Sequence, residues 1–276
     1  MSFHSQSRSM RPRKLHTLHR RADKATRHPP LLFVHGGYVA ASCWDEYFLP
    51  YFSRRGFDCH AVDLSGHGLS EGRERLDSFG LDDYVDDVIQ VAASLDERAV
   101  LIGHSMGAAI VERFLERAPA RAAVLMAPVP TIGTLAATMK LALTEPAFFT
   151  EVTRASRGQY SEKTLKIMRD VYYSPDMKPE DLLRFQFHFQ SESSRAVTEM
   201  TLLGLRFPGR RPKLPTLVIG GERDAVFPPH LLDFTAARWK AEVAVVPRAG
   251  HTIMLDAHWE AAAEHIARWV ERREGA

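Results

Sequence analysis

Three residue types that together can activate a hydroxyl group occur in separate parts of this 276-residue chain. Ser105 lies in Gly103-His104-Ser105-Met106-Gly107, between the apolar run 99–102 and a segment, 108–117, whose pattern suits a helix. A serine at such a strand-to-helix turn sits on a strained backbone, and the glycines two positions away avoid collisions. Because a serine hydroxyl is a weak nucleophile, it needs a base to take its proton and an acid to orient that base. The pentapeptide therefore predicts Ser105 as a nucleophile.

Candidates for the base and the acid follow two later apolar runs. His251 comes shortly after the run 243–246, and Asp224 comes shortly after the run 214–219. The chain order serine, acid, histidine is one of the known orders of such a catalytic set. We predict His251 as the base and Asp224 as the acid, with Glu222 as a less favoured alternative acid.

The negative oxygen that forms when a serine attacks a carbonyl needs hydrogen-bond donors, and the loss of one donor costs on the order of 10²–10³ in rate. The backbone N–H of Met106 is one candidate. The second is the N–H of Gly37, in the loop after the apolar run 31–34, with Tyr38 as a less favoured alternative. Tyr38 and His104 are the candidates for substrate binding, although we expect no direct chemistry from the His104 ring.

The elements that must position these residues are indicated by hydrophobic patterning. Continuous apolar runs are typical of strands buried on both faces of a parallel sheet, and helices show apolar residues at a spacing of three to four. Strand-like and helical segments alternate, which predicts an α/β fold with a mostly parallel central sheet flanked by helices. The predicted strands are 31–34, 58–62, 99–102, 122–126, 214–219 and 243–246, and the predicted helices are 44–55, 81–95, 108–117 and 258–272.

This alternation is interrupted in the middle of the chain. From 129 to 211 the pattern is helical, divided by prolines and rich in aromatic residues and methionines. We expect a helical cap over 129–211, inserted into a core formed by 29–128 and 212–276. Most of the aromatic and methionine side chains of the cap are expected in its core, and the others would line an apolar substrate pocket.

The first 28 residues are strongly basic, with eight lysines and arginines against one aspartate. They lack the apolar segment of a secretory signal and are expected to be a partly mobile tail or an edge strand. His16 and His19 lie here, but no further ligands are evident, so no metal site is predicted. Over the whole chain, the net charge of +2 gives no reason to expect nucleic acid as a partner.

Two further features bear on location. Cys43 and Cys59 do not form a disulfide framework, and no apolar run is long enough for an integral membrane segment. We expect a cytoplasmic protein, and the sequence does not indicate its oligomeric state.

From about residue 30 to the end, the chain resembles the α/β-hydrolase superfamily, in its serine esterase and lipase branch, with a helical cap. The resemblance is carried by His35-Gly36-Gly37, Gly66-His67-Gly68-Leu69-Ser70, Gly103-His104-Ser105-Met106-Gly107, Gly-Glu-Arg-Asp224 and Gly250-His251, in this order. It implies Ser105, Asp224 and His251 as nucleophile, acid and base, and it implies no cofactor. In that family Asp63 is usually structural and the histidines His35, His67 and His104 belong to motifs whose backbone matters, while Asp256 and His258 fit the start of a helix. Only residues 14–20 remain for the family's leading strands, so the opening hairpin is expected to be shortened.

The predicted activity is hydrolysis of a small-molecule carboxylic ester with a hydrophobic group, through an acyl-enzyme on Ser105. The same residues would serve a thioesterase, a C–C bond hydrolase or a perhydrolase. A non-catalytic ligand receptor is a further alternative. Serine at the turn argues against haloalkane dehalogenases and epoxide hydrolases, which normally carry aspartate there.

Overall fold

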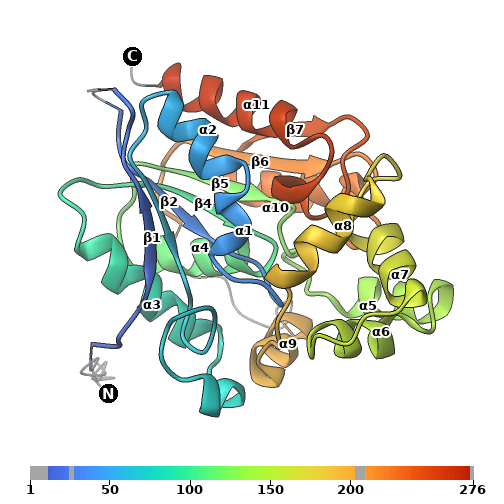
Figure 1. Ribbon diagram of the computed structural model, residues 1–276. Coiled ribbons are helices and arrows are strands. Elements are labelled where there is room, and N and C mark those ends of the chain that lie inside the picture. Colours follow the sequence, from blue (N-terminus) through green and yellow to red (C-terminus); the bar gives the residue numbers. More distant parts are fainter. Residues whose placement is uncertain (1–11, 25–27, 203–208, 210, 274–276) are drawn as a thin grey trace.

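The computed structural model describes residues 12–24, 28–202, 209 and 211–273. Within these residues seven strands form one sheet in the order β1-β3-β2-β4-β5-β6-β7 (Figure 1). All neighbouring strands are parallel except β1, which pairs antiparallel with β3. The strands are β1 (Thr17–Arg20), β2 (Leu31–Val34), β3 (Cys59–Val62), β4 (Val100–His104), β5 (Ala122–Met126), β6 (Thr216–Gly221) and β7 (Glu242–Val246). The prediction of an α/β fold with a mostly parallel sheet is confirmed.

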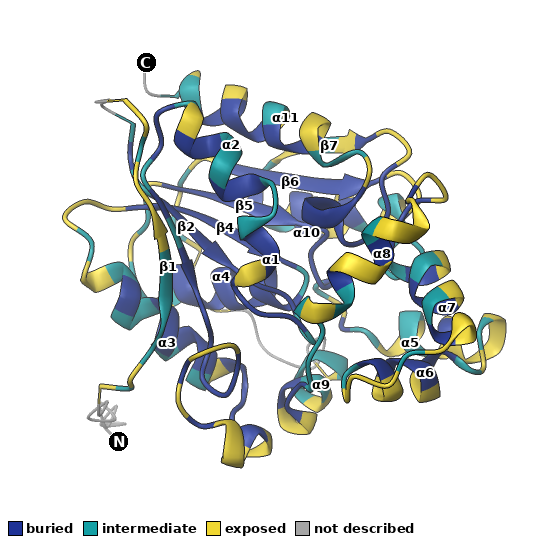
Figure 2. Cartoon of the chain, viewed as in Figure 1, coloured by how far each residue is buried: buried dark blue, intermediate teal, exposed yellow. Residues whose placement is uncertain are grey.

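Helices cover both faces of the sheet because alternate strand residues point to opposite sides. Leu31 and Phe33 pack in a core with α1, α2 and α11, whereas Leu32 and Val34 pack in a second core with α3, α4 and α10. Figure 2 shows the central strands buried and the outer sides of the helices exposed. The bounds are α1 (Ser42–Asp45), α2 (Phe48–Arg54), α3 (Leu81–Ala93), α4 (Met106–Arg117), α10 (Leu232–Trp239) and α11 (Trp259–Glu271).

Two helical segments differ from the sequence prediction. The single helix expected over 44–55 is two helices, and the break falls at Glu46 and Tyr47. Pro50 explains the break, because a proline has no N–H to bond the carbonyl four residues earlier and is tolerated only in a first helical turn. Helix α10 was not predicted at all. Four short 3₁₀ segments complete the described helices: Arg73–Ser78, Gln186–His188, Pro229–Leu231 and Ile253–Leu255.

Between β5 and β6 the described residues form five further α-helices, called the inserted helices here: α5 (Leu135–Thr144), α6 (Phe148–Ala155), α7 (Glu162–Tyr172), α8 (Pro179–Phe185) and α9 (Ser194–Thr201). Figure 1 shows α5, α6 and α7 gathered to one side of the sheet. They hold an apolar cluster separate from the two cores: Leu141, Phe148, Val152, Ala155, Ile167, Met168 and Val171. Met139 and Phe187, two of the methionine and aromatic side chains in this region, are exposed.

The basic N-terminal segment contributes one edge strand, β1, within the described residues. Arg13 anchors the stretch before it through ion pairs of 2.9 Å with Asp83 and 2.7 Å with Asp87. The rest of the predicted tail, residues 1–11 and 25–27, lies outside the described residues. Among the helices of the described part, none has both the length and the apolar character needed to cross a membrane.

Candidate active site

Ser105 occupies the sharp turn between β4 and α4. Its backbone has φ 52° and ψ −113°, a conformation that L-residues rarely adopt. The turn is tight: a Cβ on Gly103 would lie 2.4 Å from the carbonyl oxygen of Gly107, and a Cβ on Gly107 would lie 2.2 Å from that of Val34. The N–H of Ser105 donates a 2.9 Å hydrogen bond to the Met126 carbonyl on β5, which helps to hold the strained residue.

The structure brings Ser105, His251 and Asp224 into one chain of hydrogen bonds. The Ser105 Oγ lies 3.1 Å from the His251 Nε2, and the His251 Nδ1 lies 2.8 Å from the Asp224 Oδ2. The second oxygen of Asp224 accepts the backbone N–H groups of Val226 at 2.8 Å and Phe227 at 2.7 Å. These two bonds fix the direction of the carboxylate.

The positions of Asp224 and Glu222 distinguish the two carboxylates that the sequence offered as the acid. Glu222 is exposed and its carboxylate accepts the N–H of Arg248 at 2.8 Å, whereas the carboxylate of Asp224 contacts the His251 ring. Asp224 accepts a proton-bearing Nδ1 and thereby leaves the lone pair of the His251 Nε2 directed at the serine hydroxyl. The geometry is suited to removing a proton from Ser105.

The two residues whose N–H groups are the expected oxyanion donors, Gly37 and Met106, line the same cavity as Ser105. Met106 is the first residue of α4, so its N–H has no partner inside the helix, and the positive helix end adds to its field. The N–H of Tyr38, the alternative donor, is engaged by the Glu192 Oε2 at 3.2 Å.

Glu192 is a residue that the sequence did not single out. Its side chain is fully buried in the segment before α9, and Oε2 accepts hydrogen bonds from the Tyr38 N–H and, at 3.1 Å, from the His67 ring. Its Oε1 accepts from the Tyr84 hydroxyl at 3.1 Å and from the Ser193 N–H at 2.7 Å. No motif or periodicity marks this glutamate, so only the fold reveals its contacts.

The loop that carries Gly37 is therefore bonded to the segment before α9 through both the N–H and the carbonyl of Tyr38. Tyr38 donates its N–H to Glu192 and accepts the N–H of Gln190 at 2.8 Å. Tyr38 has φ 65°, another rarely adopted conformation, which these bonds support. The Glu192 contacts thus hold the loop that carries Gly37 in place.

His67 and Glu192 form a buried ion pair. Burial alone would lower the pKa of His67, but the charge of Glu192 raises it overall. For Glu192, burial alone would raise the pKa, but the positive charge of His67 and the hydrogen bonds lower it overall. Both ring nitrogens of His67 face acceptors, Glu192 and the Ser65 carbonyl, as a protonated ring requires. The side chain of His67 thus has a structural role that its sequence motif did not indicate.

Two other buried histidines are neutral supports of the site. Burial and the neighbouring His251 lower the pKa of His104 to about 3, and its Nε2 donates to the His251 carbonyl at 2.9 Å. Burial and the charge of His67 lower the pKa of His35 to about 4, and its Nε2 accepts the N–H of Leu64 at 3.1 Å. His104 therefore supports the backbone of His251 as well as lining the cavity.

Two buried aspartates, Asp63 and Asp256, hold loops rather than substrate-facing atoms. Asp63 accepts the N–H of Ala41 at 2.8 Å and that of Leu69 at 3.0 Å. Asp256 accepts the N–H of Gly250 at 3.2 Å, next to His251, and the N–H of His258 at 3.1 Å, just before α11. These contacts agree with the structural positions expected for both.

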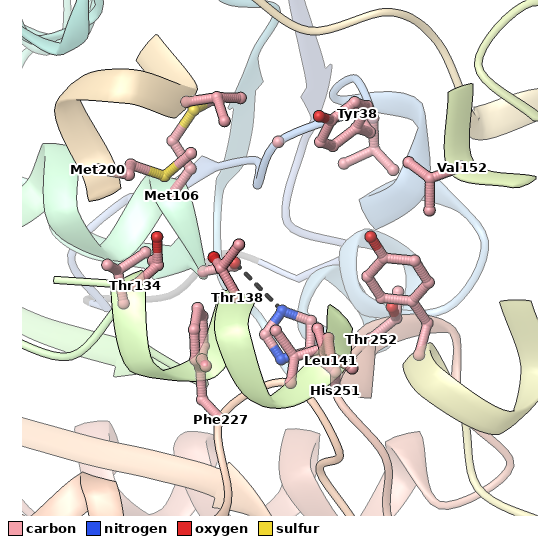
Figure 3. Close-up of a pocket in the computed structure, with 18 of the residues that line it drawn as sticks. Tyr38, Met106, Thr134, Thr138, Leu141, Val152, Met200, Phe227, His251 and Thr252 are labelled. Atoms are coloured by element: carbon pink, nitrogen blue, oxygen red, sulfur yellow. Dashed lines mark hydrogen bonds between the residues drawn. The ribbon is translucent and has the colours of Figure 1, made fainter. Parts of the chain in front are cut away.

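A cavity of about 230 Å³ opens above Ser105 (Figure 3). Its floor comes from the loop that carries Gly37 and from the Ser105 turn, and its walls come largely from the inserted helices. Among the described residues that line it, no side chain is an aspartate, glutamate, lysine or arginine. The lining is Gly37, Tyr38, Val39, His104, Ser105, Met106, Val129, Thr134, Ala137, Thr138, Leu141, Phe148, Phe149, Val152, Thr153, Tyr172, Phe189, Val197, Met200, Val226, Phe227, His251, Thr252 and Met254.

Comparisons with known proteins agree with this fold. A model of the alpha/beta hydrolase family matches residues 31–265. The AB hydrolase superfamily protein YisY of Bacillus subtilis is 27% identical over 216 residues, which cover 72% of this chain and 75% of that protein. A pyrethroid hydrolase of Sphingobium wenxiniae is 28% identical over 96 residues, so the match spans about a third of each protein, 35% of this chain and 34% of the other. The solved esterase EaEST of Exiguobacterium antarcticum superposes with a TM-score of 0.72 at 17% identity, covering 93% of this chain and 95% of the esterase.

Proposed function

The chain belongs to the alpha/beta hydrolase family, and on that premise we propose that it is a serine hydrolase of carboxylic esters. The observation that carries the proposal is the hydrogen-bonded series from Ser105 through His251 to Asp224, placed at the floor of an apolar cavity. The reaction needs no cofactor, because nucleophile, base and oxyanion donors are all groups of the chain.

In the proposed first half-reaction, the Ser105 Oγ attacks the ester carbonyl as the His251 Nε2 takes its proton. The carbonyl oxygen becomes negative and receives hydrogen bonds from the N–H groups of Gly37 and Met106. When the intermediate collapses, His251 returns the proton to the leaving alcohol. Asp224 stabilises the imidazolium throughout and keeps its own charge.

In the second half-reaction, His251 takes a proton from water, and the resulting hydroxide attacks the acyl group on Ser105. The acid product leaves, and the serine regains its proton from His251. Water is the only co-reactant that this proposed cycle needs.

The inserted helices supply most of the cavity wall, and we propose that the described part of 129–211 forms a cap that selects the substrate; residues 203–208 and 210 of the expected cap lie outside the described residues. Because no charged side chain lines the described part of the cavity, an uncharged, apolar acyl or alcohol group is favoured. Tyr38 also stays uncharged there, because burial and Glu192 raise the pKa of its phenol to about 12. We also propose a cytoplasmic location. It is supported by Cys43 and Cys59, which are buried and form no disulfide, as is usual for cysteines in a reducing compartment.

The test is a series of p-nitrophenyl esters of increasing acyl length, with a thioester, a C–C bond substrate and hydrogen peroxide with a carboxylate in parallel. Ester turnover that is lost in Ser105→Ala supports the proposal. Turnover of only one of the other three would replace it with the corresponding activity.

Covalent labelling by a fluorophosphonate separates an enzyme from a ligand receptor. The wild type is expected to take up one label that Ser105→Ala does not. Equal labelling of both proteins, or none of either, would remove Ser105 from the role of nucleophile.

A further inference from the structure

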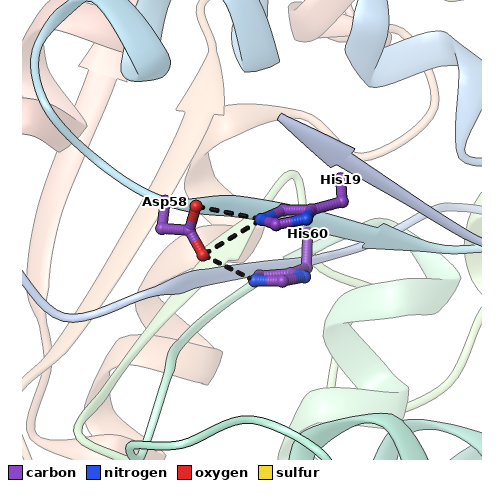
Figure 4. Close-up of side chains that lie close together, drawn as sticks. All are labelled: His19, Asp58 and His60. Atoms are coloured by element: carbon purple, nitrogen blue, oxygen red, sulfur yellow. Dashed lines mark hydrogen bonds and ion pairs between the residues drawn. The ribbon is translucent and has the colours of Figure 1, made fainter. Parts of the chain in front are cut away.

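Two histidines and one aspartate meet on the outer part of the sheet, where β1 pairs with β3 (Figure 4). His19 lies directly opposite His60 in the antiparallel register. Directly opposite residues of an antiparallel pair project to the same face, and so does Asp58, which lies two positions before His60. Cys59, between them, points to the other face and is buried in the core. The three polar side chains are thus assembled by the strand register.

Their ligand atoms are already close together. The Asp58 Oδ2 lies 3.1 Å from the His19 Nε2 and 3.0 Å from the His60 Nε2, and all three ligand atoms fall within 4.8 Å of one another. A zinc ion bound tetrahedrally at about 2.0–2.2 Å needs its ligand atoms about 3.3–3.5 Å apart. The two N···O separations would have to widen by only a few tenths of an ångström.

The surroundings allow an ion to enter. The side chains of His19 and Asp58 are 38% and 40% exposed, and the His60 side chain is 14% exposed, so solvent reaches the cluster from one side. The two rings are stacked, with centroids 4.2 Å apart and planes at 9°. The adjacent Arg20 is paired with Asp45 at 2.9 Å and does not occupy Asp58.

We propose that His19, His60 and Asp58 form a binding site for a divalent transition-metal ion, best suited to Zn²⁺. Two imidazole nitrogens and one carboxylate oxygen are a ligand set that zinc accepts, and water completes the tetrahedron. When the ion binds, each neutral ring carries its proton on Nδ1, and the Nε2 atom, which now donates to Asp58, offers its lone pair to the ion. His19 lies on β1, His60 lies on β3, and Asp58 directly precedes β3. The ion would therefore link the edge strand β1 to the rest of the sheet.

The site has no part in the chemistry at Ser105. It lies toward the amino ends of the parallel strands, where Cys59 is level with Leu31, whereas Ser105 follows the carboxyl end of β4. Its expected effect is on stability, because an ion that binds the folded chain and not the unfolded chain raises the unfolding temperature.

The experiment is a zinc titration of the full-length, untagged chain, followed by calorimetry and by competition with a chromophoric chelator. The wild type is expected to bind one Zn²⁺ at this site and to gain thermal stability from it. His19→Ala and His60→Ala should each weaken this binding tenfold or more and abolish the thermal gain. Asp58→Asn, which keeps the volume and removes the charge, should weaken it as well.

His265→Ala is the matched control, because His265 is an exposed histidine of α11 that does not belong to the cluster of His19, Asp58 and His60. It should bind zinc as the wild type does. Cobalt added in place of zinc should give the absorption of a tetrahedral ion in the wild type and lose it in His60→Ala, and circular dichroism verifies that each variant is folded. Absence of zinc binding in the wild type, or equal binding in the wild type, His19→Ala and His60→Ala, would overturn the proposal.

Discussion

The Glu192→Gln substitution tests whether the buried carboxylate before α9 holds the loop that carries Gly37. Each oxygen of Glu192 accepts two hydrogen bonds, so four donors depend on it. Glutamine has the same shape but one acceptor oxygen, and its NH₂ group can only donate. Whichever way the amide of the variant turns, its NH₂ group replaces one of the two carboxylate oxygens. The two donors that bonded that oxygen are then left without an acceptor.

The cost follows from burial. A buried donor left without an acceptor costs about 1–3 kcal/mol, and breaking a buried ion pair from one side costs about 3–5 kcal/mol. We therefore expect the free energy of unfolding to fall by about 3 kcal/mol. For a chain of this size that lowers the melting temperature by about 6–12 °C.

The effect on catalysis is expected in kcat. When Tyr38 loses its bond to residue 192, the adjacent Gly37 N–H is no longer fixed, and loss of one oxyanion donor lowers the rate on the order of 10²-fold. KM should change less, because Glu192 is not among the residues that line the cavity.

The stability difference between wild type and variant should depend on pH. The pKa of Glu192 is lowered by folding, so its contribution is present above the ordinary pKa of a glutamate and is lost as pH falls through its folded value. The pKa of His67 is raised, so its contribution is complete below the ordinary pKa of a histidine and is lost as pH rises through its folded value. The difference should be largest between about pH 4.3 and 6.5 and shrink on either side.

The assays are thermal unfolding across this pH range and steady-state hydrolysis of a p-nitrophenyl ester. Glu180→Gln, an exposed glutamate of α8, serves as the control and should change neither value. If Glu192→Gln melts within a degree or so of the wild type and keeps its kcat, the proposed role of Glu192 is wrong.

Three other substitutions test separate parts of the site and core. Asp224→Asn should lower kcat about 10³–10⁴-fold with little change in melting temperature, because the amide favours the wrong tautomer of His251; a pH-rate profile with unchanged kcat would contradict this. Val152→Phe, in the cavity wall, should shift the preferred p-nitrophenyl ester toward shorter acyl chains, and an unaltered chain-length profile would argue against substrate binding beside α6. Burial raises the pKa of Glu112 to about 7, so its contribution to stability is lost as pH rises from about 4.5 through 7. Glu112→Gln should therefore match the wild type at low pH and exceed it in free energy of unfolding by roughly 3 kcal/mol at pH 8, as measured by denaturant unfolding; parallel pH curves for the two proteins would refute the shifted pKa.

The sheet was accessible to sequence reasoning because its central strands are buried on both faces. Runs such as Leu31–Val34 and Ala122–Met126 are wholly apolar. A helix that packs on one face of a sheet needs apolar residues only on the side that contacts the sheet. The positions of Ser105, Asp224 and His251 followed from the same strands, since each lies just beyond a strand end at one edge of the sheet. The missed helix α10 has a weaker apolar pattern, with Leu232, Ala236 and Trp239 as its buried positions.

Contacts between distant segments were beyond prediction because they depend on register and docking. Glu192 meets Tyr38 across 154 residues of sequence, and nothing near Glu192 in the chain indicates that partner. His19 carried no evident metal partners, because Asp58 and His60 join it only once β1 pairs with β3 in one particular register. A shift of one residue would place His60 and His19 on opposite faces.

The separate apolar cluster of the inserted helices has a consequence for how this enzyme can diverge. Phe148 and Val152 belong both to that cluster and to the cavity wall, whereas the sheet cores supply the turn that carries Ser105. Substitutions that reshape the cavity wall therefore affect the stability of the apolar cluster of the inserted helices. They leave the packing beneath Ser105 intact. Mutational drift in α5, α6 and α7 can change which molecules are accepted while the reaction itself is conserved, so substrate range and chemistry can evolve at different rates in one chain.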